Sequence, residues 1–180
     1  MTAVIRPASL RDVDELAELV AAAYRATYAD LVPPATLDTV VPQVSAPEGL
    51  RRMLQDVERG AGLSRALVAV EGETLVGFLD FAEEHDGLEL RRLYTRVGMT
   101  SKGVGAALLR ALEDTLPAGT RYRIVVVEGN TRGLRFWKRH GFEEVGEVDG
   151  IEHFSRHRGV EFDPETTGPR LTVLMRTAGG

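Results

Sequence analysis

The sequence contains no cysteine among its 180 residues. Disulfide bonds are therefore excluded, as is any mechanism that carries a group on an enzyme thiol. No window approaches 18 uninterrupted apolar residues, so no membrane-spanning helix is expected. The N-terminus also lacks the basic start and long apolar run that are typical of a secretory signal. We therefore expect a cytoplasmic protein with no membrane partner.

Clusters of lysine and arginine are also missing. The 22 basic and 27 acidic residues give a formal net charge of −5. No basic block provides the positive surface that a nucleic-acid backbone requires, so nucleic acid is not an expected partner. Apolar residues make up 43% and charged residues 27% of the chain, which is ordinary for a globular protein. The length suits one domain over residues 1–180.

Helix and strand patterns alternate along the chain. Apolar residues at helical spacing predict helices at about 9–28, 47–59, 104–116 and 131–140. Extended patterns predict strands at about 3–6, 65–71, 75–82, 88–95, 124–127 and 171–176. Signals are weak over residues 35–46, and residues 149–170 read as a long charged connection. These patterns predict an α/β (α+β) fold with about four helices.

A glycine-rich turn, Thr100-Ser101-Lys102-Gly103-Val104-Gly105, lies between a predicted strand and a predicted helix. Backbone N–H groups at a helix start lack intrahelical partners and attract anions, and glycine lets a phosphate approach closely. A P-loop would need Lys and then Ser or Thr after its closing glycine, and a dinucleotide fingerprint would need a third glycine at Leu108. Both motifs fail, so the turn alone predicts only an anion site.

A second segment follows the β-branched run 124–127. It contains Asn130, Phe136 and Trp137, and it ends in the pair Gly141-Phe142. Together the two segments resemble the GNAT superfamily of N-acetyltransferases over about residues 88–145. Three positions depart from the family pattern: Thr100 replaces Gln or Arg, Gly133 replaces Ala, and Trp137 replaces Tyr.

The resemblance implies a mixed, mostly antiparallel twisted sheet with a splayed central parallel strand pair. It also implies that acetyl-CoA binds between those strands as co-substrate and gives its acetyl group directly to a primary amine. The residues that the resemblance assigns to acetyl-CoA are Leu93, Tyr94, Thr95, Thr100, Ser101, Lys102, Gly103, Val104, Gly105, Ala106, Asn130, Phe136 and Trp137. A non-catalytic acetyl-CoA sensor is the alternative.

The resemblance also suggests catalytic roles. The family often uses a carboxylate near the start of the fourth strand as the base, which is Glu89 here; the alternative is a carboxylate paired with a neighbouring arginine. A backbone N–H of Tyr94 or Thr95 would stabilise the thioester oxygen. Because the indole of Trp137 is no useful acid, the thiolate leaves unprotonated, takes a proton from water, or takes one from another tyrosine. Tyr94 is the candidate for that tyrosine, unless it only packs in the core.

The acceptor site is expected to include Tyr24, Tyr28 and Asp30. Four carboxylates within seven residues favour a cationic acceptor such as a polyamine, an aminoglycoside or a protein amine, unless they form a solvated turn. These carboxylates are Glu83, Glu84, Asp86 and Glu89. His153 and His157 stand at i and i+4 beside Glu152, but no third ligand is evident, so no metal is expected. A homodimer is left open.

Overall fold

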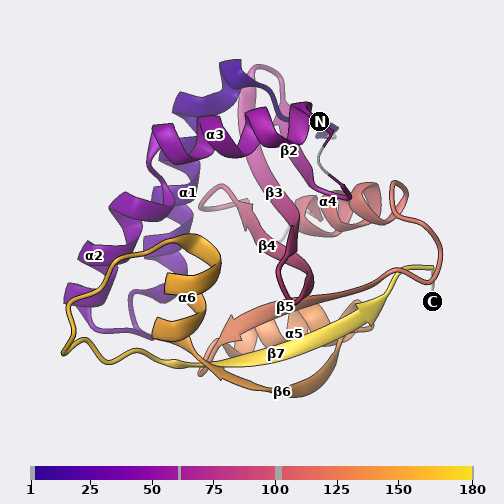
Figure 1. Ribbon diagram of the computed structural model, residues 1–180. Coiled ribbons are helices and arrows are strands. Elements are labelled where there is room, and N and C mark those ends of the chain that lie inside the picture. The colour runs from indigo at the N-terminus through magenta and orange to yellow at the C-terminus, as the bar shows by residue number, and fades with distance from the viewer. Residues whose placement is uncertain (1–2, 61, 100–102, 180) are drawn as a thin grey trace.

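The computed structural model describes residues 3–60, 62–99 and 103–179, which form a seven-stranded sheet with helices on both faces (Figure 1). In chain order the elements are β1 (Val4–Pro7), a 3-10 turn (Leu10–Asp12), α1 (Val13–Tyr28), α2 (Pro34–Val44), α3 (Pro47–Glu58), β2 (Arg65–Glu71), β3 (Thr74–Glu84), β4 (Gly87–Thr95), α4 (Val104–Glu113), β5 (Arg121–Val127), α5 (Thr131–Arg139), β6 (Glu143–Asp149), α6 (Gly150–Arg158) and β7 (Arg170–Thr177). None of the helices within these ranges is long and apolar enough to cross a membrane.

The sheet has the strand order β1-β2-β3-β4-β5-β7-β6 and is antiparallel except between β4 and β5. Within the described ranges, these two parallel strands are paired only at Glu89 and Arg123. Strands β5–β7 run at a steep angle to strands β2–β4 (Figure 1). The expected mixed, mostly antiparallel sheet is confirmed, and its central parallel strands diverge on one side of a single contact.

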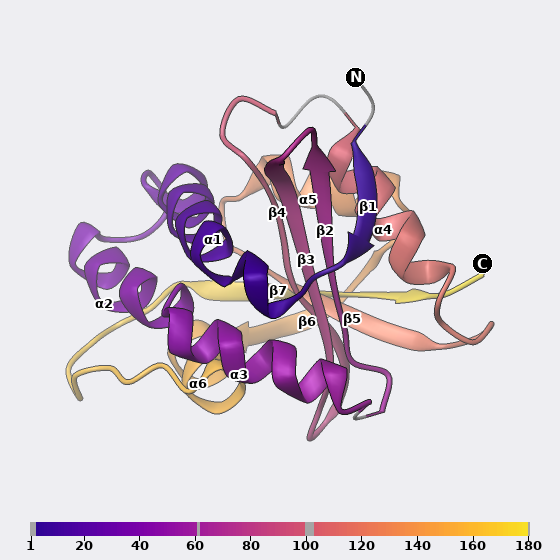
Figure 2. The ribbon, with the colours of Figure 1, turned by 90° about the horizontal axis from the view of Figure 1, so that it is seen from above.

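Helices cover the sheet in two groups, as the view from above shows (Figure 2). Helices α1 and α3 pack on one face of β2–β4, and α4 packs on the opposite face of β1–β4. Gly77 of β3 allows α4 to approach closely, because a Cβ there would lie 2.8 Å from Val104 Cγ1 and 2.9 Å from Leu108 Cδ1. Since Gly77 is paired with Thr95, the start of α4 lies near the end of β4.

The described residues form six α-helices, two more than expected from the sequence. Helix α2 begins at Pro34 and contains Pro42, although a proline inside a helix cannot donate its backbone hydrogen bond. Helix α6 lies inside the predicted long connection. It is capped by Asp149, whose side chain accepts a 2.9 Å hydrogen bond from Glu152 N, and it ends at Gly159 in the left-handed conformation.

Candidate active site

The first turn of α4 lies near the end of β4. Gly103 precedes the helix with φ +79°, and no side chain in the described part of the chain caps it. Ala107 N donates a 3.0 Å hydrogen bond to Gly103 O, and among the described residues the N–H groups of Val104, Gly105 and Ala106 have no helical acceptor. This geometry fits an anion. The predicted contacts Thr100, Ser101 and Lys102 lie outside the described residues.

The second half of β4 has one open edge. Its residues Leu93, Tyr94 and Thr95 are paired with Leu79, Phe78 and Gly77 of β3. Their other edge faces β5, which within the described ranges is paired with β4 only at Glu89. The backbone groups on that edge are available to a bound molecule. The predicted contact of this strand with acetyl-CoA stays a prediction, and the open edge provides room for it.

Helix α5 starts beside α4. Asn130 caps it by accepting a 2.9 Å hydrogen bond from Gly133 N, so its side-chain oxygen has a structural partner. A Cβ at Gly105 would lie 3.5 Å from the ring of Phe136, which places the two helices in contact. Trp137 is 6% exposed, and its ring packs edge-on against Phe136 and Phe142, with centroids 4.8 and 5.0 Å apart. The position of Trp137 favours packing over proton transfer.

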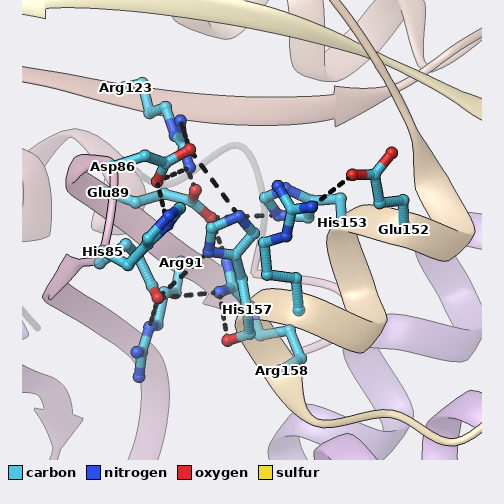
Figure 3. A network of polar contacts seen from close by, with 11 residues as sticks. His85, Asp86, Glu89, Arg91, Arg123, Glu152, His153, His157 and Arg158 are labelled. Carbon is cyan, nitrogen blue, oxygen red and sulfur yellow. Dashed lines mark hydrogen bonds and ion pairs between the residues drawn. The ribbon is translucent and has the colours of Figure 1, made fainter.

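Glu89 is fully buried at the contact between β4 and β5 (Figure 3). Its Oε2 accepts from Arg123 Nε at 2.9 Å, and its Oε1 accepts from Arg158 Nη2 and lies 3.3 Å from His153 Nε2. Burial alone would raise the pKa of Glu89, but the contacts with His153 and the charge of Arg158 lower it well below its usual value. The base role of Glu89 stays a prediction, and these contacts are a physical argument against it.

Helix α6 is bound to the β3–β4 hairpin by a second carboxylate, Glu84. Its Oε1 accepts from Arg91 Nε at 2.5 Å and from Arg158 Nη1 at 3.3 Å, and its Oε2 lies 3.2 Å from His157 Nδ1. A further ion pair joins Asp86 to Arg123 through two hydrogen bonds of 2.8 and 2.9 Å. Three of the four carboxylates expected to attract a cationic acceptor are thus already paired.

His153 and His157 are joined to two different carboxylates. His153 contacts Glu89, and His157 contacts Glu84. The described residues contain no group of three or more His, Cys, Asp or Glu side chains arranged to hold a metal ion.

A pocket opens between α1, α6 and the two diverging strands. Its lining combines three arginines, three tyrosines and apolar side chains: Val20, Tyr24, Tyr28, Val44, Arg91, Arg92, Tyr94, Val125, Val127, Phe154, Arg158 and Leu171. Burial raises the pKa of all three tyrosines above the usual value, so each stays a neutral phenol. The predicted acceptor residues Tyr24 and Tyr28 are brought together here, with rings 4.5 Å apart. Asp30 is exposed and is not part of the lining.

An apolar pocket continues from the first one and shares Tyr24, Tyr28, Val127 and Phe154 with it. Its remaining lining comes from α2, the start of α6 and the connection to β7: Val32, Thr36, Leu37, Val40, Gly150, Ile151, Phe162 and Pro169. Both helices missing from the sequence prediction therefore contribute to the walls. The two pockets form one candidate acceptor site with an arginine end and an apolar end.

Sequence reasoning missed the three pocket arginines. Arg91 and Arg92 are adjacent in a strand, where the alternation of side chains would place them on opposite faces of the sheet. Arg158 belongs to a segment for which the sequence predicts a long connection, not a helix. The available signals were the two consecutive arginines, which interrupt the alternation, and the cap residues Asp149 and Gly159, which enclose a helix.

Comparisons with known proteins agree with this geometry. The model of the acetyltransferase (GNAT) family matches residues 21–142. A spermidine N(1)-acetyltransferase of Thermoplasma acidophilum is 26% identical over 156 residues, which cover 84% of this chain and 94% of that protein.

Two solved structures show the same fold. The crystal structure of the PaiA N-acetyltransferase of T. acidophilum in complex with coenzyme A has a TM-score of 0.76 and 20% identity, covering 98% of this chain and 99% of that one. An acetyltransferase of Thermus thermophilus has a TM-score of 0.66 and 22% identity, covering 98% and 97%. With a family model that spans about two thirds of its length, the chain belongs to the GNAT family of N-acetyltransferases.

Proposed function

We propose that the protein binds acetyl-CoA between β4 and β5 and transfers its acetyl group directly to a primary amine held in the arginine–tyrosine pocket. The observation that carries this proposal is the divergence of the two strands beyond Glu89 and Arg123. It leaves the edge of Leu93–Thr95 open beside the uncapped start of α4, and Tyr94 also lines the pocket. Donor and acceptor would thus meet at the second half of β4.

In this reaction the amine nitrogen attacks the thioester carbonyl carbon, the carbon–sulfur bond breaks, and the nitrogen loses a proton to water. The oxygen that gains charge needs a fixed donor, for which the backbone N–H of Tyr94 or Thr95 is our candidate. The thiolate, from a thiol of ordinary pKa near ~8.5, leaves as an anion or takes a proton from water. Since burial raises the pKa of Tyr94 well above the usual value, its phenol is better suited to donate a hydrogen bond than to give up a proton.

We propose that Glu89 is a positioning residue. Its carboxylate holds Arg123 and Arg158 and does not line either pocket. The described lining residues include no carboxylate and no histidine, the usual neutral-pH bases. The acceptor would therefore bind as the neutral amine or lose its proton to water, and the rate would rise with pH until the amine is unprotonated.

The acceptor class has support from one relative. The name of the T. acidophilum protein states that it acetylates spermidine, which makes a polyamine one acceptor to test here. The sequence-based argument for a cationic acceptor is weaker, because Glu84, Asp86 and Glu89 are paired with arginines of this chain.

The test is a thiol-release assay with acetyl-CoA and a panel of amines. The enzyme contributes no thiol of its own because it lacks cysteine. We expect release that depends on both acetyl-CoA and an amine. Tight acetyl-CoA binding without release on any amine would instead support the sensor. A rate that is independent of pH below the pKa of the amine would contradict binding as the neutral amine.

A further inference from the structure

We propose that the acceptor amine also carries a carboxylate, which binds to Arg92 and Arg158 in the pocket beside Tyr94. This inference rests on the proposed acetyl transfer and specifies its acceptor as an amphoteric molecule with an apolar body. The chemistry is the pairing of a carboxylate with guanidinium groups, which form parallel charge-assisted hydrogen bonds.

A bulge in β4 places two consecutive arginines on the pocket. Asp80 of β3 is paired with Arg92, but the next residue, Phe81, is paired with Leu90, so Arg91 is the extra residue. Leu90 and Leu93 on either side pack into the core under α4. Both residues between them therefore turn to the opposite face, where Arg91 and Arg92 line the pocket.

Arg92 is a buried cation that has few partners of its own. Its side chain is 14% exposed, and among the described residues it donates one hydrogen bond, from Nη1 to Val44 O at 3.3 Å. Its Nε lies 3.4 Å from Asp80 Oδ2, an oxygen that makes no hydrogen bond with any described residue. Since a guanidinium has five N–H donors, most of those on Arg92 remain for a ligand.

Like charges surround Arg92 on the pocket side. Burial lowers the pKa of Arg92, Asp80 opposes this effect, and the charges of Arg158 and Arg91 lower the pKa further. An anion between Arg92 and Arg158 would remove this repulsion. Arg158 is held there by Glu84 and Glu89, which contact it from outside the pocket lining.

The remaining walls suit a carboxylate better than a polyamine. The other described lining residues of both pockets are tyrosines, a threonine and apolar or small residues, without any acidic side chain. The second ammonium group of a polyamine would lie near arginines and would have no carboxylate partner. A carboxylate at the arginine end would let an apolar side chain enter the second pocket through Tyr24 and Phe154.

The test measures acceptor binding to the protein saturated with coenzyme A, which permits no turnover. Calorimetry would compare L-leucine with L-leucinamide, 6-aminohexanoate with hexylamine, and all four with spermidine. We expect the carboxylate-bearing member of at least one pair to bind about 10- to 100-fold more tightly than its match without a carboxylate, because hydrogen bonds between charged groups have that effect. Equal affinities in both pairs, or tightest binding of spermidine, would overturn the proposal.

Variants of Arg92 connect the effect to the pocket. Arg92→Gln should bring the affinity ratio within each pair toward one, and Arg92→Lys should lower it while keeping the charge that faces Asp80. Arg132→Gln, on the exposed surface of α5, is the matched control and should leave the ratio unchanged. Coenzyme A affinity reports folding, and if Arg92→Gln does not fold, Arg92→Lys carries the test. If the affinity ratio within each pair stays unchanged in the Arg92 variants, the proposed site is refuted.

Thiol release with acetyl-CoA is measured separately on the same ligands. Discrimination between the paired ligands without any release would contradict the proposed acetyl transfer and still support the carboxylate site. Release without discrimination would support the transfer and overturn the carboxylate site.

Discussion

Glu89 occupies the one described position at which β4 and β5 are paired. Its carboxylate joins three elements, because Arg123 comes from β5 while Arg158 and His153 come from α6. Substitution of a buried carboxylate with several cationic partners strongly destabilises the fold, because removal of one charge leaves the others without compensation.

We expect Glu89→Gln to lower the free energy of unfolding by about 3–5 kcal/mol, the usual cost of breaking a buried ion pair. The shape of the kcat/KM profile between pH 5 and pH 9 should not change, because the pKa of Glu89 lies well below that range. Urea unfolding and pH-dependent kinetics measure the two effects.

The matched control is Glu147→Gln, because the partner of Glu147 is Arg170 in a pair whose side chains are more than half exposed. Its effect on stability should stay within about 0–1 kcal/mol. Loss of an acid limb from the rate profile of Glu89→Gln would restore Glu89 as the base.

Some candidate site residues can be identified from local sequence patterns, and others cannot. Gly103 was selected for its place before a helix, and the structure assigns it the left-handed conformation that such a turn requires. Asn130 and Phe136 were selected by resemblance, and they lie next to α4 or cap α5. Arg92 was not selected, because the bulge that turns it to the pocket depends on the register with β3, which the two consecutive arginines alone do not define.

Among the elements, α4 begins with the turn that is expected to bind an anion. We predict that Gly103→Ala lowers acetyl-CoA affinity at least tenfold and costs about 1–3 kcal/mol of stability, because φ +79° strains any residue with a Cβ. Gly72→Ala is the matched control, with φ +65° and no atom within 4 Å of the added Cβ, in the β2–β3 turn. Its stability cost should be similar.

Calorimetric titration with acetyl-CoA separates the two glycine variants. Equal losses of affinity in both would show that strain alone lowers binding, and full affinity in Gly103→Ala would contradict the role of this turn.

Helix α6 is held on the hairpin by Glu84, Glu89 and their partners. We predict that Glu84→Gln speeds hydrogen exchange of backbone amides in residues 150–158 by about 10- to 100-fold, because Arg158 and His157 lose a buried carboxylate. The KM for the acceptor should rise, since Phe154 and Arg158 line the pocket.

Glu152→Gln is the control for this helix, because Glu152 pairs with Arg156 on its exposed side. Its exchange rates should change less than about threefold. Unchanged exchange in Glu84→Gln would show that α6 is held by its apolar contacts alone.

The two helices that sequence reasoning missed have different physical explanations. The apolar side of α2, which includes Leu37, Val40 and Val41, is buried, so tertiary packing offsets the hydrogen bond that Pro42 cannot donate. Helix α6 is rich in charges and has no apolar stripe of its own, because its inner side is bound by ion pairs. The strands of the meander, by contrast, carried their own alternating and turn signals and were predicted with nearly correct bounds.

The free energy of unfolding of the whole molecule should decrease in acid. The pKa values of Asp12, Asp86, Glu89 and Glu113 are lowered by arginine partners and hydrogen bonds, and that of Asp12 falls from 3.8 to about 2. Groups with a lowered pKa stabilise the fold above their unfolded-state values and lose this contribution as the pH falls. The urea midpoint should therefore decrease below about pH 4.5, the ordinary glutamate value.

Asp12→Asn tests one part of this slope, because the carboxylate accepts two 2.8 Å hydrogen bonds from Arg6. The variant should be less stable at neutral pH and should lose less stability between pH 4 and pH 2 than the parent protein. Constant stability from pH 5 to pH 3 in the parent would contradict the prediction.

The single contact between β4 and β5 also has a consequence for how the chain acquires its structure. Strands β1–β4 with α4 form one continuous half, and β5–β7 form another, so backbone hydrogen bonds hold each half together much more than they join the halves. Side chains from both halves, such as Leu90, Tyr122 and Leu174, pack together in one core. The first half precedes the second in the sequence, so it can assemble during synthesis before β5 has left the ribosome.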